Sequence, residues 1–381
     1  MQEIKSQQEF DAALAILDGG HPDGEQYQRL TTLVLDHPAA GALAALDPFS
    51  AEYRAAVLDF YAVLRARAGD AAYVTERDEA SDTGGRVPAN LWTGLVPWSF
   101  RDLKLSAEFL LSWGHILQLL EVAPGQSVLE YGPGSGQILL MLARMGVQAH
   151  GVDIDRTALD GIRAQADALG LPVALDRAVF GEGFDDRRFD AILFFEAFHH
   201  ALDFPALLER LHDRLAPGGR LVLCGEPIVE MPFPGIPFSW GPRLDALSIY
   251  CMRKWGWMEL GFTRPFLTEA ARRAGWQMTP HPFPGCGRAS AFVLTPAEPR
   301  EPIMPAQNDV PAPVPTIQEI RDQSRAALTA LAGQHQRELD ALHRSTSWQI
   351  TGPLRAMGRL KHRLRRGSRR NGSDKDACHN K

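Results

Sequence analysis

Three side chains that can move protons or bind metals stand close together in the stretch "FFEAFHHALD", at Glu196, His199 and His200. Histidine titrates near neutral pH, which suits it to accept a proton from a reacting group. Glu196 and one histidine are also potential metal ligands, if a third group such as Glu226 in "CGEPI" converges on them. A third interpretation is structural, with one histidine capping a loop and the other packed beneath it. The choice depends on the elements that position these side chains.

The composition indicates a globular protein. The chain has 381 residues, of which 45% are hydrophobic and 23% charged, enough for one large or two ordinary domains. Its beginning, "MQEIKSQQEF", lacks the apolar stretch of a signal peptide, and no run approaches the roughly 18 apolar residues of a membrane span. Four scattered cysteines without a C-x-x-C pair predict neither a disulfide framework nor a zinc knuckle. We therefore expect a cytoplasmic protein.

Short apolar runs separated by helix-like segments begin near residue 126, among them "SVLEY", "QAHGVDI", "FDAILFF" and "GRLVLCGE". This alternation predicts parallel strands joined by crossover helices, which is an α/β fold with a doubly wound, Rossmann-like sheet over residues 121–297. Earlier segments such as "AEYRAAVLDFYAVLRARAG" have apolar residues at helical spacing. They predict a helical N-terminal region over residues 1–120.

A glycine-rich turn follows the first predicted strand in "VLEYGPGSGQ", with Gly132, Gly134 and Gly136 spaced G-x-G-x-G. A dinucleotide fingerprint needs its third glycine where Gln137 stands. With Glu130 before it, the stretch instead resembles motif I of the class I S-adenosylmethionine (SAM)-dependent methyltransferases. The resemblance implies that Glu130 and the three glycines bind SAM, with the glycines allowing close backbone approach.

The order of the following segments extends this resemblance over residues 126–228. "GVDID" places Asp153 after the second strand, where such methyltransferases keep an acid for the ribose hydroxyls. "FDAILFF" resembles their fourth strand, and "LHDRLAPGGRLVLCGEP" their following helix, turn and fifth strand. Asp176 stands where the family's adenine-contacting acid is expected, with Phe180 as the alternative cover for the base.

The same resemblance gives a role to the opening stretch. In an open parallel sheet the ligands bind beyond the carboxyl ends of the strands, and in these methyltransferases the end of the fourth strand faces the methyl acceptor. We therefore assign Glu196, His199 and His200 as catalytic candidates, with one histidine as the base, and expect no metal. The two histidines are expected to differ, because adjacent side chains point in different directions.

Residues 232–262 form a long insertion between the fifth strand and the next helix, and such insertions at a ligand edge are often lids. The insertion carries aromatic faces and hydrogen-bonding groups that suit a sugar or another polar acceptor. The alternative is that its tryptophans form the insertion's own core. These side chains are Trp240, Arg243, Asp245, Arg253, Trp255 and Trp257.

Three segments follow the sheet domain. Residues 298–315 are rich in proline and predict a stiff linker. Residues 316–346 have apolar positions in an eleven-residue repeat, which predicts a coiled-coil helix and a homo-oligomer, or else a single amphipathic helix. From Arg355 the chain carries ten Lys and Arg against two Asp, a net charge of +8, whereas the whole chain carries −6. We therefore expect the tail, residues 347–381, either to attach to the anionic inner face of a membrane or to be a solvated end.

A second resemblance concerns the acceptor. Residues 345–355, "STSWQITGPLR", are similar to segments that follow coiled coils in bacterial enzymes of surface-polysaccharide synthesis. The sequence thus predicts a SAM-dependent methyltransferase that acts on a sugar hydroxyl or a polysaccharide end. The alternatives are a nucleic-acid or small-molecule methyltransferase, or a SAM-binding coiled-coil scaffold without turnover. A nucleic-acid acceptor is disfavoured because "EAFHH" lacks the Asn or Asp with two prolines of base-amino methyltransferases.

Overall fold

A computed structural model describes residues 2–4, 7–15, 30, 32–66, 73 and 87–297. The chain divides into two compact units, residues 1–300 and residues 301–381. The second unit and the whole of the predicted linker lie outside the described residues. The linker, the coiled coil, the homo-oligomer and the membrane-binding tail therefore stay predictions. Among the helices that are described, none combines the length and apolar character needed to cross a membrane.

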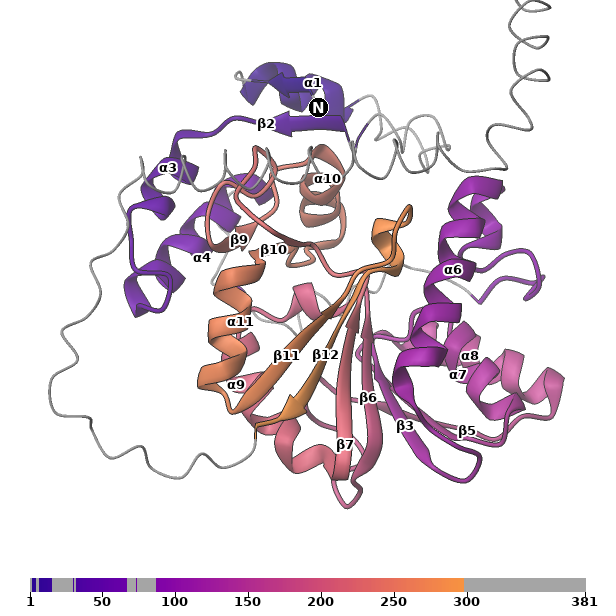
Figure 1. The fold of residues 1–381 in the computed structure, drawn as a ribbon. Coiled ribbons are helices and arrows are strands. Elements are labelled where there is room, and N and C mark those ends of the chain that lie inside the picture. Colours follow the sequence, from indigo (N-terminus) through magenta and orange to yellow (C-terminus); the bar gives the residue numbers. More distant parts are fainter. Residues whose placement is uncertain are drawn as a thin grey trace, which may run out of the picture. The chain divides into compact units, whose positions relative to one another are not determined.

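A seven-stranded sheet forms the centre of the first unit (Figure 1). Its strand order is β11-β12-β7-β6-β3-β4-β5. Five neighbouring strands, β7 to β5 in that order, run parallel, and β12 runs antiparallel to both of its neighbours. The predicted doubly wound, Rossmann-like sheet is confirmed. The strands are β3 (Ser127–Tyr131), β4 (Gln148–Asp153), β5 (Val173–Arg177), β6 (Phe189–Phe195), β7 (Leu215–Cys224), β11 (Trp276–His281) and β12 (Ala291–Pro296).

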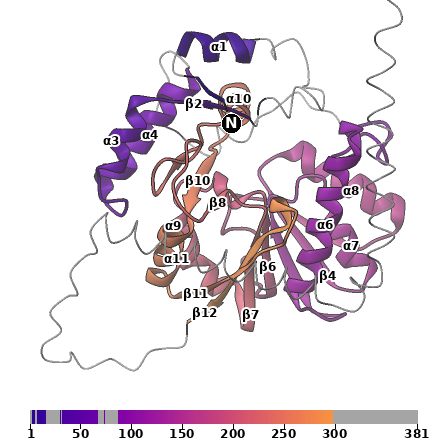
Figure 2. The same ribbon diagram turned by 45° about the horizontal axis from the view of Figure 1, so that its top comes forward.

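Helices cover both faces of this sheet because its strands are apolar on both sides. In β6, Leu193 packs in the core on the face of α6, α7 and α8, while Phe194 packs on the face of α9 and α11 (Figures 1 and 2). Successive strand side chains point to opposite faces, so one apolar run supplies both cores. The helices are α6 (Leu103–Leu120), α7 (Gln137–Arg144), α8 (Arg156–Leu169), α9 (Phe204–Leu211) and α11 (Arg264–Arg273).

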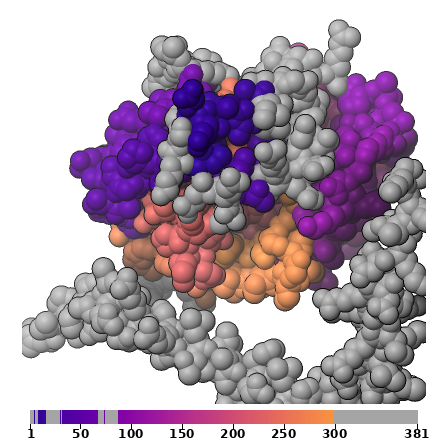
Figure 3. Space-filling view, turned by 90° about the horizontal axis from the view of Figure 1, so that it is seen from above, coloured from indigo at the N-terminus to yellow at the C-terminus, as the bar shows by residue number. Residues whose placement is uncertain are grey.

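The insertion after β7 packs against the N-terminal residues, which lie beside it when the molecule is seen from above (Figure 3). The Tyr53 hydroxyl donates to the carbonyl of Trp240 at 2.6 Å, and the Tyr61 hydroxyl donates to that of Gly256 at 2.6 Å. The elements are β1 (Gln2–Ile4), α1 (Gln7–Ala15), β2 (Leu33–Leu35), α3 (Pro38–Ala44), α4 (Ala51–Arg65), β8 (Ile228–Val229), β9 (Trp240–Pro242), α10 (Ala246–Trp255) and β10 (Leu260–Thr263). The region predicted as helical thus also contributes two short strands, and its last helix, α6, packs on the sheet.

Candidate active site

A cavity of about 550 Å³ lies at the carboxyl ends of β3, β4 and β6, where the sequence places the ligand site. Its walls include the glycine-rich loop and the ends of these strands on one side, and part of the "EAFHH" turn on the other. Its volume falls within the range of small-molecule sites.

The three glycines of the loop serve different purposes, and all have positive φ angles, of 66°, 51° and 70° in chain order. A Cβ at Gly132 would lie 2.8 Å from that of Ala197, and one at Gly136 would lie 2.5 Å from Ile162 on α8. These two positions therefore allow close packing of the loop. A Cβ at Gly134 would meet nothing within 4 Å, and Gly134 lines the cavity. It leaves room there for a ligand to approach the backbone.

Two carboxyl groups line the cavity next to this loop. Glu130, near the carboxyl end of β3, is 2% exposed, and its Oε2 has no hydrogen-bond partner among the described residues. Burial, with a contribution from the Asp153 charge, raises the pKa of Glu130 well above its usual value. Burial also raises the pKa of Asp153 to about 6, although its Oδ1 accepts the Asp155 N–H at 2.9 Å. An unpartnered buried oxygen is costly, so this wall favours a ligand that donates hydrogen bonds.

Asp176 does not reach the cavity. Its carboxylate accepts the backbone N–H of Arg177 at 2.8 Å and that of Phe184 at 3.2 Å, so it holds the turn after β5. Val179 and Phe180, which follow in the same turn, line the cavity instead. The alternative from the sequence, an aromatic cover supplied by Phe180, therefore agrees with the structure better than the acid at Asp176.

Glu196 begins the "EAFHH" turn in a left-handed conformation, with φ of 51°. This backbone region is unfavourable for a residue with a side chain and needs support from its surroundings. The support includes an ion pair between the Glu196 carboxylate and Arg288, and a bond from its N–H to the carbonyl of Cys224 at 2.9 Å. Glu196 lines the cavity, and its carboxylate is paired with a guanidinium.

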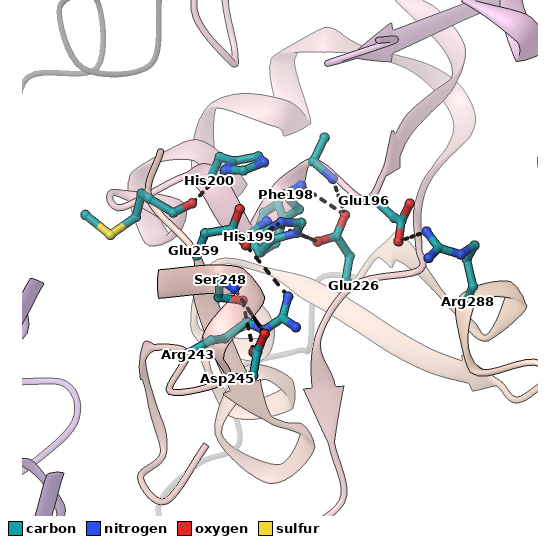
Figure 4. Close-up of polar contacts among 12 residues, drawn as sticks. Glu196, Phe198, His199, His200, Glu226, Arg243, Asp245, Ser248, Glu259 and Arg288 are labelled. Carbon is teal, nitrogen blue, oxygen red and sulfur yellow. Dashed lines mark hydrogen bonds and ion pairs between the residues drawn. The ribbon is translucent and has the colours of Figure 1, made fainter. Parts of the chain in front are cut away.

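The two histidines, both on a short 3-10 helix at Phe198–His200, make different contacts (Figure 4). His199 is 6% exposed, and its Nδ1 lies 2.8 Å from Oε2 of Glu226. His200 lines the cavity, and its Nδ1 lies 2.6 Å from the carbonyl oxygen of Met258. Burial lowers the pKa of each to about 3, so both are neutral at physiological pH. Of the two, His200 is the one that can meet a bound acceptor.

Glu226 holds this turn in place from the end of β7. Its Oε1 accepts the N–H groups of Ala197 and Phe198, each at 2.9 Å, and its Oε2 accepts that of His199 at 3.0 Å. The hypothetical metal set of Glu196, Glu226 and a histidine is therefore not assembled, because each carboxylate is engaged elsewhere.

Most of the polar and aromatic groups predicted in the insertion make structural contacts, either within the insertion or with the N-terminal residues. The Trp240 indole N–H donates to the carbonyl of Pro48 at 2.8 Å, and Arg243 donates to Asp245 at 3.0 Å. Arg253 donates to Asp11 at 2.7 Å. Trp257, in contrast, lines the cavity beside His200. The structural alternative thus describes most of these groups, although the core is shared with the N-terminal residues and is not the insertion's own.

Sequence reasoning missed one wall of the cavity. Residues 94–96, which precede α6, line it together with Phe109 and Trp113 of that helix. The signal for the helix was its apolar periodicity, "LSAEFLLSWGHILQLL", and that pattern does not distinguish a side chain facing the sheet from one facing a ligand.

Residues 111–280 match the family model described as a methyltransferase domain. This match supports the interpretation of this part of the chain as a class I, SAM-dependent methyltransferase domain. The domain is similar to the protein-L-isoaspartate O-methyltransferase of Methylorubrum extorquens, with 36% identity over 28% of this chain and 45% of that protein. It is also similar to the demethylmenaquinone methyltransferase of Thermus thermophilus, with 35% identity over 30% of this chain and 51% of that protein. The chain thus spans about half the length of these curated relatives.

A solved structure, the S-adenosylmethionine dependent methyltransferase from Mesorhizobium loti, aligns with 48% of this chain and 96% of its own, with 18% identity and a TM-score of 0.39. SAM is the methyl donor that the methyltransferase domain implies. The residues fit this cofactor, because the unpartnered Glu130 oxygen, the open side of Gly134 and the Asp153 carboxyl group meet in one cavity.

Proposed function

We propose that the protein transfers a methyl group from SAM to a hydroxyl or other nucleophilic group held beside His200. The observation that carries the proposal is the sharing of one cavity: Glu130, Gly134 and Asp153 line its cofactor side, and His200 and Trp257 line the other. Transfer of a methyl group is an in-line displacement, so a site that aligns both reactants and excludes water supplies much of the catalysis.

The cofactor side offers a complementary group for each part of SAM, which supplies a methyl group activated by a positively charged sulfur. Asp153 accepts hydrogen bonds from the ribose hydroxyls, and the free Oε2 of Glu130 accepts one from the cationic amino acid end. Phe180 offers an aromatic face to the adenine. We propose no cofactor contact for Asp176, whose carboxylate is occupied by backbone N–H groups.

On the acceptor side, His200 presents a nitrogen with a free lone pair. The Met258 carbonyl can only accept a hydrogen bond, so Nδ1 of His200 carries the proton and Nε2 has the lone pair. That nitrogen can take up the proton that a hydroxyl loses as it is methylated. We propose His199 and Glu196 as positioning groups, because Glu226 and Arg288 respectively engage them.

The acceptor we propose is a sugar hydroxyl or a polysaccharide end. Its support is the similarity of residues 345–355 to segments of polysaccharide-synthesis enzymes. The two curated relatives named above differ in the acceptors that their names print, and neither name contains a sugar. The alternatives are a nucleic-acid or small-molecule acceptor, or SAM binding without turnover.

Calorimetry with SAM on the full chain tests the cofactor side. Asp153→Arg should abolish the binding heat, because it removes the ribose acceptor and puts a cation beside a cationic ligand. Asp160→Arg is the matched control, since Asp160 is exposed on α8 and pairs with Arg163. Equal SAM affinity in the wild type and Asp153→Arg would end the cofactor assignment.

Radiolabel transfer from methyl-labelled SAM to separated carbohydrate, nucleic-acid and small-molecule extracts tests the acceptor. His200→Ala should lower transfer by roughly 10²- to 10⁴-fold with SAM affinity nearly unchanged. Label in the nucleic-acid fraction would replace the sugar with that acceptor class. Binding of SAM with no transfer to any fraction would favour the scaffold.

A further inference from the structure

The two histidines of the acceptor wall lie next to a buried carboxyl group, Glu259, to which the methyl-transfer proposal gives no role. His199, His200 and Glu259 each offer a nitrogen or oxygen atom that lies within 4.8 Å of the other two. Nε2 of His199 is 3.6 Å from Oε2 of Glu259 (Figure 4). A tetrahedral ion with bonds of about 2.0–2.1 Å spaces its ligand atoms roughly 3.4 Å apart. We propose that these three side chains bind a divalent transition-metal ion, with Zn²⁺ as the best match.

The hydrogen bonds of the two histidines are those of metal ligands. Nδ1 of His199 is held by the Glu226 carboxylate at 2.8 Å, and Nδ1 of His200 by the Met258 carbonyl at 2.6 Å. Both acceptors fix the ring proton on Nδ1 and leave the Nε2 lone pair for another partner. Histidines that bind metals almost always donate their second ring nitrogen to a carboxylate or a carbonyl in this way.

The charge around the group favours a cation. Three carboxyl groups, those of Glu226, Asp245 and Glu259, are buried here next to the partly exposed Arg243 guanidinium. Arg243 lies 3.0 Å from Asp245 but 3.7 Å from Glu259, so its closer pairing is with Asp245. A bound divalent ion would add positive charge next to these buried carboxyl groups.

The ligand set indicates which ion would bind, and its location indicates which way the ion's free coordination position would face. Two imidazole nitrogens with one carboxylate oxygen are a three-ligand zinc set that leaves a fourth position free. His200 lines the cavity, so the open position would face the proposed acceptor side. Nickel, cobalt and copper also suit imidazole ligands, and Co²⁺ is therefore a usable spectroscopic probe. The proposal goes beyond methyl transfer, because the three ligands are separate from the SAM-binding wall. It shares His200 with the proposed acceptor side, and an Nε2 bound to the ion would not be available as the base.

Zinc binding to the full chain, stripped with a chelator and titrated with ZnCl₂ in the absence of SAM, tests the site. The wild type should bind one ion per chain with a Kd at or below about 1 μM, in the affinity range of a specific ligand. His200→Gln and Glu259→Gln should each weaken binding by at least about 100-fold, more than the loss of an outer hydrogen-bond partner costs. His281→Gln, at the end of β11, is the matched control and should bind like the wild type.

Two results would overturn the site. One is a wild-type chain that takes up no ion at 100-fold molar excess of zinc. The other is wild-type affinity in folded His200→Gln and Glu259→Gln proteins, which would place the ion elsewhere, for example at His379 or Cys378. Should either variant fail to fold, X-ray absorption of the zinc-loaded wild type decides: two imidazoles without sulfur support the site, and a sulfur ligand excludes it. SAM binding is measured separately, so failure here leaves the methyltransferase proposal standing.

Discussion

Replacing Glu226 with glutamine should destabilise the protein markedly, although the two side chains have almost the same shape. The Glu226 carboxylate is fully buried and accepts four hydrogen bonds, two on each oxygen. An amide keeps one acceptor oxygen and turns the other position into a donor. With the amide nitrogen in the Oε1 position, the N–H groups of Ala197 and Phe198 both lose their acceptor. With it in the Oε2 position, the His199 N–H loses its acceptor, and Nδ1 of His199 keeps the contact only if the ring proton moves to Nε2.

The expected loss follows from these contacts. Each buried donor left without a partner costs about 1–3 kcal/mol, and removing a buried charge whose pKa is raised by burial offsets part of this. We therefore expect Glu226→Gln to lower the free energy of unfolding by about 2–4 kcal/mol. With a urea dependence of about 3 kcal/mol per M, the unfolding midpoint should fall by roughly 1 M.

Urea unfolding of the full chain, followed by near-UV circular dichroism, is the assay. Glu230→Gln is the matched control, because the Glu230 side chain is 67% exposed and pairs only at the surface with Arg264. Its midpoint should stay within about 0.2 M of wild type, since exposed ion pairs contribute little. If both variants unfold at the same urea concentration, the account of how Glu226 holds the histidine turn is wrong.

Two further predictions concern the cofactor wall. Burial raises the pKa of Asp153 from 3.8 to about 6, so the SAM-free folded state binds the carboxyl proton of Asp153 more tightly than the unfolded chain does. The folded state therefore loses stability as the pH rises from about 4 through 6. Asp153→Asn should then raise the urea midpoint at pH 7.5 and change it little at pH 4, and a lower midpoint at pH 7.5 would contradict this. Gly136→Ala should lower the free energy of unfolding, measured by thermal unfolding, by more than about 2 kcal/mol, because the new methyl group clashes with Ile162 and φ is positive. Gly170→Ala is the control: its φ is 65° but no atom lies within 4 Å, so it should cost only about 1 kcal/mol. Equal losses in the two variants would refute the packing argument.

Much of the fold and the cofactor side could be predicted from the sequence. The strand and helix segments between residues 126 and 228 contain apolar runs of the right length, so each element can be predicted from its own residues. The glycine loop and Asp153 are equally local, because a turn with positive φ angles needs glycine wherever the chain later leads. Their meeting at one edge follows from the parallel sheet itself.

The roles of the two histidines, in contrast, were decided by the tertiary structure. They are adjacent and chemically identical, and what distinguishes them is Glu226, on the segment after β7, and Met258, in the insertion. Asp176 was misleading for the same reason, since the fold of the following turn directs its carboxylate to backbone N–H groups. The spacing of apolar residues predicts helices and strands because it depends only on residues that are close in the sequence. The partner of a buried polar group is set by whichever distant segment packs against it, and only the folded chain contains that information.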